Sequence, residues 1–233
     1  MWLSHGGFAI LYDAVMRTVE RGRLAEWRRE LVRPAQGDVL EIAAGTGLNF
    51  VHYRSGTTVV ATEPDWHMLE RARDRARQAG ATISLVAADA LALPFRDQSF
   101  DTVVVGLGLC TIASPPRALA ELRRVLRRGG VARLLEHVRV EGAVIGRLQD
   151  VLTPLWRRLA GGCRLNERSV DGVRRAGFRV DGLRSYMRGC VVAITASTSD
   201  DAPPLREADR GFGPRSRTSA SALPHEVRDS GDR

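Results

Sequence analysis

The sequence predicts an α/β fold in which a parallel sheet is covered by helices on both faces. Three observations lead to this prediction. Short β-branched runs alternate with helical stretches from residue 37 to residue 196. The runs are almost continuously apolar, which is typical of parallel strands buried on both sides. The chain has 233 residues, enough for one such domain with short extensions.

Five runs predict the parallel strands of this sheet, and two later ones predict further strands. The first five are 39–42, 58–61, 83–86, 102–105 and 131–138. The later two are 178–186 and 190–196. Each is short and rich in Val, Ile, Leu or Ala, so we expect them to form the buried centre of the domain.

Helices are predicted before the first strand and between the later ones. Apolar residues recur at helical spacing over 8–32. Asp65 is placed to cap a helix that Gly80 ends, and Ser114 precedes a helix that we expect to stop at Gly129. Two more helices are predicted, at 148–159 and 169–176.

The charge is strongly positive, but its distribution does not favour a nucleic-acid partner. The net charge is +8 and every one of the 35 basic residues is Arg. These Arg residues are scattered beside Asp and Glu on predicted helix faces, whereas a nucleic-acid site usually forms one basic stripe. A solvated surface is the better interpretation, and peripheral contact with a membrane surface stays open.

The three cysteines and the start of the chain bear on the cellular environment. Cys110, Cys163 and Cys190 are far apart in the sequence and odd in number. This pattern indicates reduced thiols that pack as small buried side chains, rather than a disulfide framework or a zinc site. We therefore expect no bound metal. No run approaches the roughly 18 apolar residues of a membrane span, and no secretory signal precedes residue 8, so we expect a cytoplasmic protein.

A glycine-rich turn follows the first predicted strand and marks a ligand site. Gly45 and Gly47 allow a tight bend and a close backbone approach to a ligand. Glu63 ends the second strand, 18 residues beyond Gly45, where an acidic side chain can accept hydrogen bonds from ribose hydroxyls. Asp89 follows the third strand and Asp101 leads into the fourth. We expect all of them at the carboxyl edge of the sheet. The third glycine of a dinucleotide motif is missing, and no triphosphate-binding motif is present.

At these residues the sequence resembles the class I methyltransferases, which use S-adenosylmethionine, over roughly residues 37–138. The segment 41–47 is similar to the family's first motif, Glu63 to its ribose-binding acid, and 88–95 to its adenine-side motif. The resemblance implies a Rossmann-like, seven-stranded, mostly parallel sheet with helices on both faces and an antiparallel last strand. Ala43 departs from the pattern because the family usually has a glycine there, and we expect its methyl group to lie close to the cofactor.

Over about 8–196 the chain also resembles the branch that contains thiol S-methyltransferases, which implies a small-molecule acceptor, most simply a thiol. Methylation at N or O of a lipid headgroup or secondary metabolite, and cofactor binding without catalysis, are the alternatives. Glu167 stands where the branch usually has an Arg. The implied cofactor-binding residues are Tyr12, Glu41, Ala43, Gly45, Gly47, Asn49, Glu63, Asp89, Ala90 and Leu107.

Two residues at the end of the fifth strand are the catalytic candidates. His137 could act as a general base or polarise the acceptor, with Glu136 beside it. The alternative is that either side chain only satisfies backbone groups. We expect three parts of the chain: an N-terminal helical lid at 1–36, a methyltransferase domain at 37–196, and a disordered tail at 197–233. The middle part would carry a helical acceptor-side insertion near 142–176. The oligomeric state is open.

Overall fold

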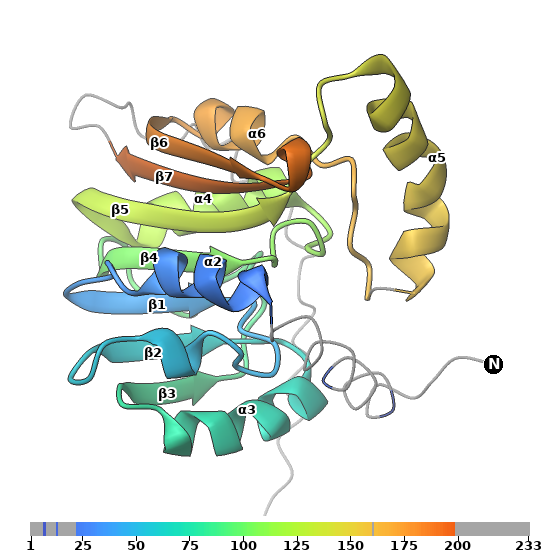
Figure 1. Ribbon diagram of the computed structural model, residues 1–233. Helices are drawn as coiled ribbons and strands as arrows, with labels where there is room; N and C mark the ends of the chain where they lie inside the picture. The colour runs from blue at the N-terminus through green and yellow to red at the C-terminus, as the bar shows by residue number, and fades with distance from the viewer. Residues whose placement is uncertain (1–6, 8–12, 14–21, 160, 199–233) are drawn as a thin grey trace, which may run out of the picture.

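The computed structural model describes Gly7, Asp13 and residues 22–159 and 161–198, which form one seven-stranded sheet with helices around it (Figure 1). The strand order is β3-β2-β1-β4-β5-β7-β6. The strands are β1 (Asp38–Ile42), β2 (Thr58–Thr62), β3 (Thr82–Val86), β4 (Phe100–Gly106), β5 (Leu126–His137), β6 (Phe178–Tyr186) and β7 (Val191–Thr198). The first five are parallel, and β7 pairs antiparallel with both β5 and β6. The predicted sheet is confirmed.

Helices cover both faces of this sheet. The α-helices are α2 (Arg23–Val32), α3 (Trp66–Gln78), α4 (Pro115–Val125), α5 (Ala143–Leu159) and α6 (Ser169–Arg175). Short 3-10 helices lie at η1 (Phe50–His52) and η2 (Met187–Gly189). Helices α2 and α3 contribute to one hydrophobic core, and α4 and α6 contribute to the other.

The strand residues alternate between these two cores because successive side chains point to opposite faces. In β1, Val39 belongs to the α2 side and Leu40 to the α4 side. In β4, Val104 and Val103 divide in the same way. All four side chains are at most 1% exposed. Burial on both faces therefore explains why the strands are so uniformly apolar.

Helix α5 is placed differently from the others. Figure 1 shows it beyond the edge at which the parallel strands end. Gln149 attaches it there: its amide nitrogen donates to the carbonyls of Val138 (2.9 Å) and Leu165 (3.0 Å), and its oxygen accepts the Val140 amide (2.7 Å). Within the described residues, no helix is both long and apolar enough to cross a membrane.

Several predicted boundaries are wrong, and three of them have a local reason. The helix expected over 8–32 is not continuous, since Gly22 has an extended backbone (φ −107°, ψ −152°) and α2 begins after it. Helix α4 ends before Gly129, because β5 already starts at Leu126. Strand β7 runs to Thr198, two residues into the segment expected to be a disordered tail. Residues 199–233 lie outside the described residues.

Of the two predicted caps, the one at Asp65 is confirmed. The Asp65 carboxylate accepts the backbone N–H groups of His67 (2.8 Å) and Met68 (3.3 Å), which satisfies two free amides at the start of α3. Ser114 precedes α4 without a side-chain cap bond, and a proline opens that helix. These two start signals place α3 and α4 where the sequence predicts them.

Candidate functional site

The glycine-rich turn after β1 is held against Glu63 at the end of β2. The Ala44 amide donates to the Thr62 carbonyl at 3.0 Å, which fixes the turn to the neighbouring strand. The Gly45 amide donates to Glu63 Oε2 at 3.0 Å, and the Asp65 amide donates to Glu63 Oε1 at 3.1 Å. Gly45 has a φ of +57°, and a Cβ built on it would meet nothing within 4 Å. The turn therefore leaves open space above Gly45, beside a fixed carboxylate.

The Glu63 carboxyl group is 9% exposed, and its ionisation reflects that burial. Burial raises its pKa above the ordinary value of 4.5, while the amides of Asp65 and Gly45 oppose the rise. Both bonds hold the carboxylate in one orientation. An oriented acceptor of this kind suits the hydroxyl groups of a ribose.

Gly47 belongs to the same turn and has a packing reason to lack a side chain. Its φ is +80°, and a Cβ there would lie 2.5 Å from the Phe50 ring. The ring is fully buried beneath the turn. Any larger residue at position 47 would therefore displace the base of the turn.

Glu41 and Asn49 form a buried network below the turn instead of facing the open space. Glu41 Oε1 accepts from the Asn49 amide nitrogen at 2.8 Å, and Glu41 Oε2 accepts from the Tyr53 hydroxyl at 2.7 Å. Arg28 of α2 donates to Asn49 Oδ1 at 3.0 Å. Burial raises the pKa of Glu41 to about 7, against the opposing effects of Tyr53, Asn49 and Arg28. Both side chains therefore support the turn.

Ala43 and Leu107 stand on neighbouring strand ends and share an unusual backbone conformation. Their φ values are +53° and +59°, in the left-handed region that favours glycine. The Ala43 methyl group is directed at Gly108, where an added Cβ would lie only 2.7 Å from it. The absence of a side chain at Gly108 therefore leaves room for the Ala43 methyl group.

Asp13 lies close to the turn, to which Arg75 connects it. It is 4% exposed and accepts from Arg71 Nε at 2.6 Å, and it forms an ion pair with Arg75 at 3.2 Å. Arg75 also donates to the Thr46 carbonyl at 2.6 Å. Burial raises the pKa of Asp13, but the nearby Thr46 hydroxyl, the hydrogen bond from Arg71 and the charge of Arg75 bring it below its usual value. Tyr12, next to Asp13, lies outside the described residues.

The two remaining acidic candidates lie at opposite edges of the sheet. Asp89 follows β3, is exposed, and accepts the Leu91 amide at 2.9 Å through Oδ1, with Ala90 buried beside it. Asp101 lies near the start of β4, where it accepts the Asp38 amide at 2.8 Å and pairs with Arg127 at 2.5 Å. It is therefore at the amino edge, and its expected place at the carboxyl edge is wrong. It ties β1 to β4 at the far end from the turn.

Glu136 is fully buried, and its carboxylate organises the loop that follows β4. Oε1 accepts the amides of Gly108 (3.2 Å) and Leu109 (2.9 Å), and Oε2 accepts the amide of Cys110 (3.1 Å). Burial raises its pKa to about 7, against these backbone bonds. With three amides bound to it, the Glu136 carboxylate holds the loop at 108–110 in place.

His137 ends β5 and contacts a pair of cysteines. Their spacing in the sequence did not predict that they meet. Its Nδ1 lies 3.5 Å from Cys163 Sγ, which is 3.4 Å from Cys110 Sγ. The hydrogen bond from Cys110 lowers the pKa of Cys163 to about 5, with help from His137, and the same bond raises that of Cys110. Burial lowers the pKa of His137, but Cys163 outweighs it and raises the pKa above 6.5. The three side chains therefore influence one another's ionisation.

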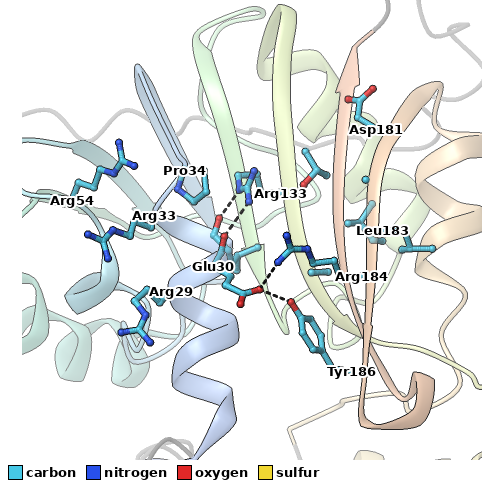
Figure 2. Close-up of a pocket in the computed structure, with 15 residues that line it drawn as sticks. Arg29, Glu30, Arg33, Pro34, Arg54, Arg133, Asp181, Leu183, Arg184 and Tyr186 are labelled. Atoms are coloured by element: carbon cyan, nitrogen blue, oxygen red, sulfur yellow. Dashed lines mark hydrogen bonds and ion pairs between the residues drawn. The ribbon is translucent and has the colours of Figure 1, made fainter.

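A separate pocket of about 710 Å³ opens on the α2 side of the sheet (Figure 2). Glu30 lies within it and accepts from the Tyr186 hydroxyl at 2.8 Å and from Arg184 at 3.1 Å. Arg133 donates to the Glu30 carbonyl at 3.1 Å. None of the predicted cofactor or catalytic residues lines this pocket.

Comparison with known proteins identifies the family. Residues 40–134 match the model of a methyltransferase domain. Human thiol S-methyltransferase TMT1A is 31% identical over 175 residues, which cover 73% of this chain and 72% of the relative. Demethylmenaquinone methyltransferase of Thermobifida fusca is 40% identical over 127 residues, 51% of this chain and 53% of the relative, so that the match spans about half of the bacterial protein.

Solved structures agree in fold. The [4+2]-cyclase SpnF superposes with a TM-score of 0.61 at 20% identity, over 76% of this chain and 80% of its own. A methyltransferase from Thermotoga maritima, titled a possible histamine N-methyltransferase, gives 0.55 at 22%, over 81% and 98%. At these identities the likeness shows the fold alone. The relatives, the domain match and the turn beside Glu63 together make the chain a member of the class I methyltransferases, enzymes that take their methyl group from S-adenosylmethionine.

Proposed function

We propose that the enzyme methylates a small-molecule thiol. The observation that carries the proposal is the extent of the similarity to human thiol S-methyltransferase TMT1A. It spans 175 residues, against 127 and 153 for the demethylmenaquinone methyltransferases of Thermobifida fusca and Paenarthrobacter aurescens. The methyltransferase domain match covers only residues 40–134, so the similarity to TMT1A extends beyond that domain. Similarity beyond the cofactor-binding part is what a shared acceptor would require.

The proposed cofactor site consists of the turn and the carboxyl ends of β2 and β3. S-adenosylmethionine, when bound, supplies a methyl group on a sulfonium centre. Gly45 would leave room for its close approach, Glu63 would accept from its ribose hydroxyls, and Asp89 would stand on the adenine side. Ala90 and Leu107 are the proposed apolar walls, and the N-terminal segment near Asp13 is the proposed lid.

The acceptor side is assigned to the carboxyl ends of β4 and β5. Methyl transfer is an in-line displacement, so most of the rate can come from holding donor and acceptor in line. A thiol needs to lose only one proton, and an ionised thiol needs no base. His137 is the proposed polar group that contacts the acceptor, whereas Glu136 holds the loop at 108–110 in place.

A second candidate is methylation of an apolar ring at carbon. The name of the Thermobifida fusca relative gives that protein a demethylmenaquinone substrate, and its identity of 40% is the higher one. Apolar side chains on α5 also favour an apolar acceptor near the carboxyl edge. They are more than 40% exposed and comprise Val144, Ile145, Leu148, Val151, Leu152, Leu155 and Trp156.

An acceptor panel tests the proposal. Production of S-adenosylhomocysteine is followed with small thiols, hydroquinones, amines and phenols. Turnover with thiols supports the proposal, while turnover only with hydroquinones supports the second candidate. Turnover only with amines or phenols indicates N- or O-methylation, and cofactor binding without turnover indicates a binding protein. Glu63→Ala is the control, since it should abolish cofactor binding and all turnover, whatever the acceptor.

A further inference from the structure

Cys110, His137 and Cys163 come from three separate segments and meet at the acceptor side of the sheet. Cys110 lies in the loop after β4, His137 ends β5, and Cys163 lies between α5 and α6. One ligand atom from each falls within 4.8 Å of the other two. We propose that these three side chains bind a soft divalent metal ion, with zinc as the preferred ion.

The distances fit a tetrahedral ion. In a tetrahedral site, zinc bonds of about 2.3 Å to sulfur and about 2.0 Å to nitrogen place two sulfurs about 3.8 Å apart and a sulfur and a nitrogen about 3.5 Å apart. The two sulfurs are 3.4 Å apart, and Cys163 Sγ is 3.5 Å from His137 Nδ1. The sulfurs therefore have to separate by about 0.4 Å, and the spacing between Cys110 and His137 has to shorten to about 3.5 Å. Side-chain rotations are smaller changes than a backbone rearrangement.

The donor set matches zinc chemistry as well. Two thiolates and one imidazole leave the fourth tetrahedral position open, as in catalytic zinc sites. Within the described part of the chain, no further His, Cys, Asp or Glu joins the cluster. Two thiolates also balance the charge of a divalent ion, so the complex can lie among buried groups. Each thiol releases its proton to solvent as it binds.

Hydrogen bonds to backbone groups already hold the ligands together before any ion binds. The Arg164 amide donates to the Cys110 carbonyl at 3.0 Å, and the Arg164 guanidinium donates to the Ile112 carbonyl at 2.7 Å. The segment that carries Cys163 is therefore fixed to the loop that carries Cys110. Glu136 fixes the same loop from β5 through its bond to the Cys110 amide. Such supporting bonds orient ligands in metal sites.

The metal site changes the role proposed for His137. Its Nδ1 would bind the ion and could no longer accept a proton from the acceptor. The open fourth position would instead receive an acceptor thiolate, and this last step alone rests on the proposed function. Zinc lowers the pKa of the groups that it binds, so a thiol placed there would ionise near neutral pH.

Cobalt titration of the metal-free protein tests the site. The protein is reduced, treated with a chelator and titrated with Co²⁺ alone. We expect the charge-transfer absorption of cobalt–thiolate bonds, saturation at one ion per chain, and displacement by Zn²⁺. Cys110→Ser and Cys163→Ser should each weaken Co²⁺ binding at least about tenfold, in line with the loss of a ligand. Cys190→Ser is the matched control and should bind as the wild type does.

A second measurement guards against variants that fold poorly. Zn²⁺ should raise the Tm of the wild type and of Cys190→Ser, and it should leave the Tm of folded Cys110→Ala and Cys163→Ala unchanged. Absence of uptake by the reduced wild type, or equal shifts in all variants, would overturn the site in favour of a thiol pair without metal. Neither readout uses a methyl acceptor, so failure of thiol methylation leaves this test intact.

Discussion

Ala43 adopts a backbone conformation that costs a residue with a side chain more than it costs glycine. Its φ is +53°. A left-handed conformation costs an alanine about 1 kcal/mol or more, so Ala43→Gly should raise the free energy of unfolding by about 1 kcal/mol. Cofactor affinity should stay equal or rise, because the methyl group is directed at Gly108. Urea denaturation and calorimetry with the cofactor measure the two effects.

The control for this substitution is Ala79→Gly. Ala79 follows α3 with an ordinary φ of −70°. Glycine there gains freedom in the unfolded chain and loses a half-buried methyl group, so the variant should lose about 1 kcal/mol. If both variants lose stability equally, the conformation at Ala43 carries no strain.

Glu41 should make stability depend on pH. Folding raises its pKa from about 4.5 to about 7, so the native state keeps a proton that the unfolded chain has released. The contribution of Glu41 to stability is therefore fully present below about pH 4.5 and is lost as the pH rises through 7. A shift of this size corresponds to about 3 kcal/mol.

The Glu41→Gln variant removes that titration. Between about pH 5 and about pH 8, it should gain up to about 3 kcal/mol relative to the wild type. Urea denaturation of both proteins at each pH gives the difference. Parallel stability curves would show that Glu41 titrates alike in the folded and unfolded chains.

Individual site residues differ in how far the sequence predicts them. Gly45 and Glu63 are predicted because a turn and a strand end fix them locally. The sequence does not show that Glu41 points below the turn, since that depends on Tyr53 and Arg28 from other elements. The positions of Cys110 and His137 after neighbouring strands were a signal that they meet at one edge. Cys163 arrives from a loop whose position only the folded chain defines.

Helix α3 links Asp13 to the glycine-rich turn. Arg75 holds both Asp13 and the Thr46 carbonyl. Asp13→Asn should weaken this link and cost about 1 kcal/mol of cofactor affinity, roughly fivefold in Kd. Calorimetric titration with S-adenosylhomocysteine measures the change.

The control is Asp74→Asn on the same helix. Asp74 forms an exposed ion pair with Arg77 at 2.9 Å, away from the turn. Exposed pairs of this kind contribute little, so cofactor affinity should stay the same. Equal affinity in Asp13→Asn would mean that the N-terminal segment takes no part in cofactor binding.

The strands were easier to predict than the point where one element becomes the next. β-branched runs locate β1, β2 and β3 within one residue, because local pattern and burial agree there. Strand β5 starts earlier than expected, since Leu126 already pairs with Phe100 of β4 and the register shifts before Val131 pairs with Thr102. Gly129, with a φ of +71°, lies within that irregularity. The start of β5 depends on the position of its partner strand β4. The apolar pattern of residues 126–137 alone carries no information about that position.

For the molecule as a whole, the sheet defines how much of the chain stability requires. Ser197 pairs with both β5 and β6, and the Thr198 hydroxyl donates to the Arg127 carbonyl at 3.0 Å. A chain that ends after Thr198 should keep the Tm of the full protein and its cofactor affinity. One that ends after Ala196 should lose about 1 to 2 kcal/mol, since ladder bonds disappear on both sides of β7. Thermal melts of the two truncations decide the boundary, and a large loss in the longer one would assign a structural role to residues 199–233.

The position of β7 also has a consequence for the order in which the protein can be completed during translation. Within the described residues, β6 pairs only with β7, and β7 is inserted between β6 and β5. The ribosome makes β6 first, but this strand can join the rest of the sheet only through β7 and has to wait until β7 has emerged. The five parallel strands can associate earlier, because each pairs with another of the five. An unpaired strand in a nascent chain can pair with wrong partners. This chain is therefore most exposed to misassembly until β7, the last strand of the sheet, has been made.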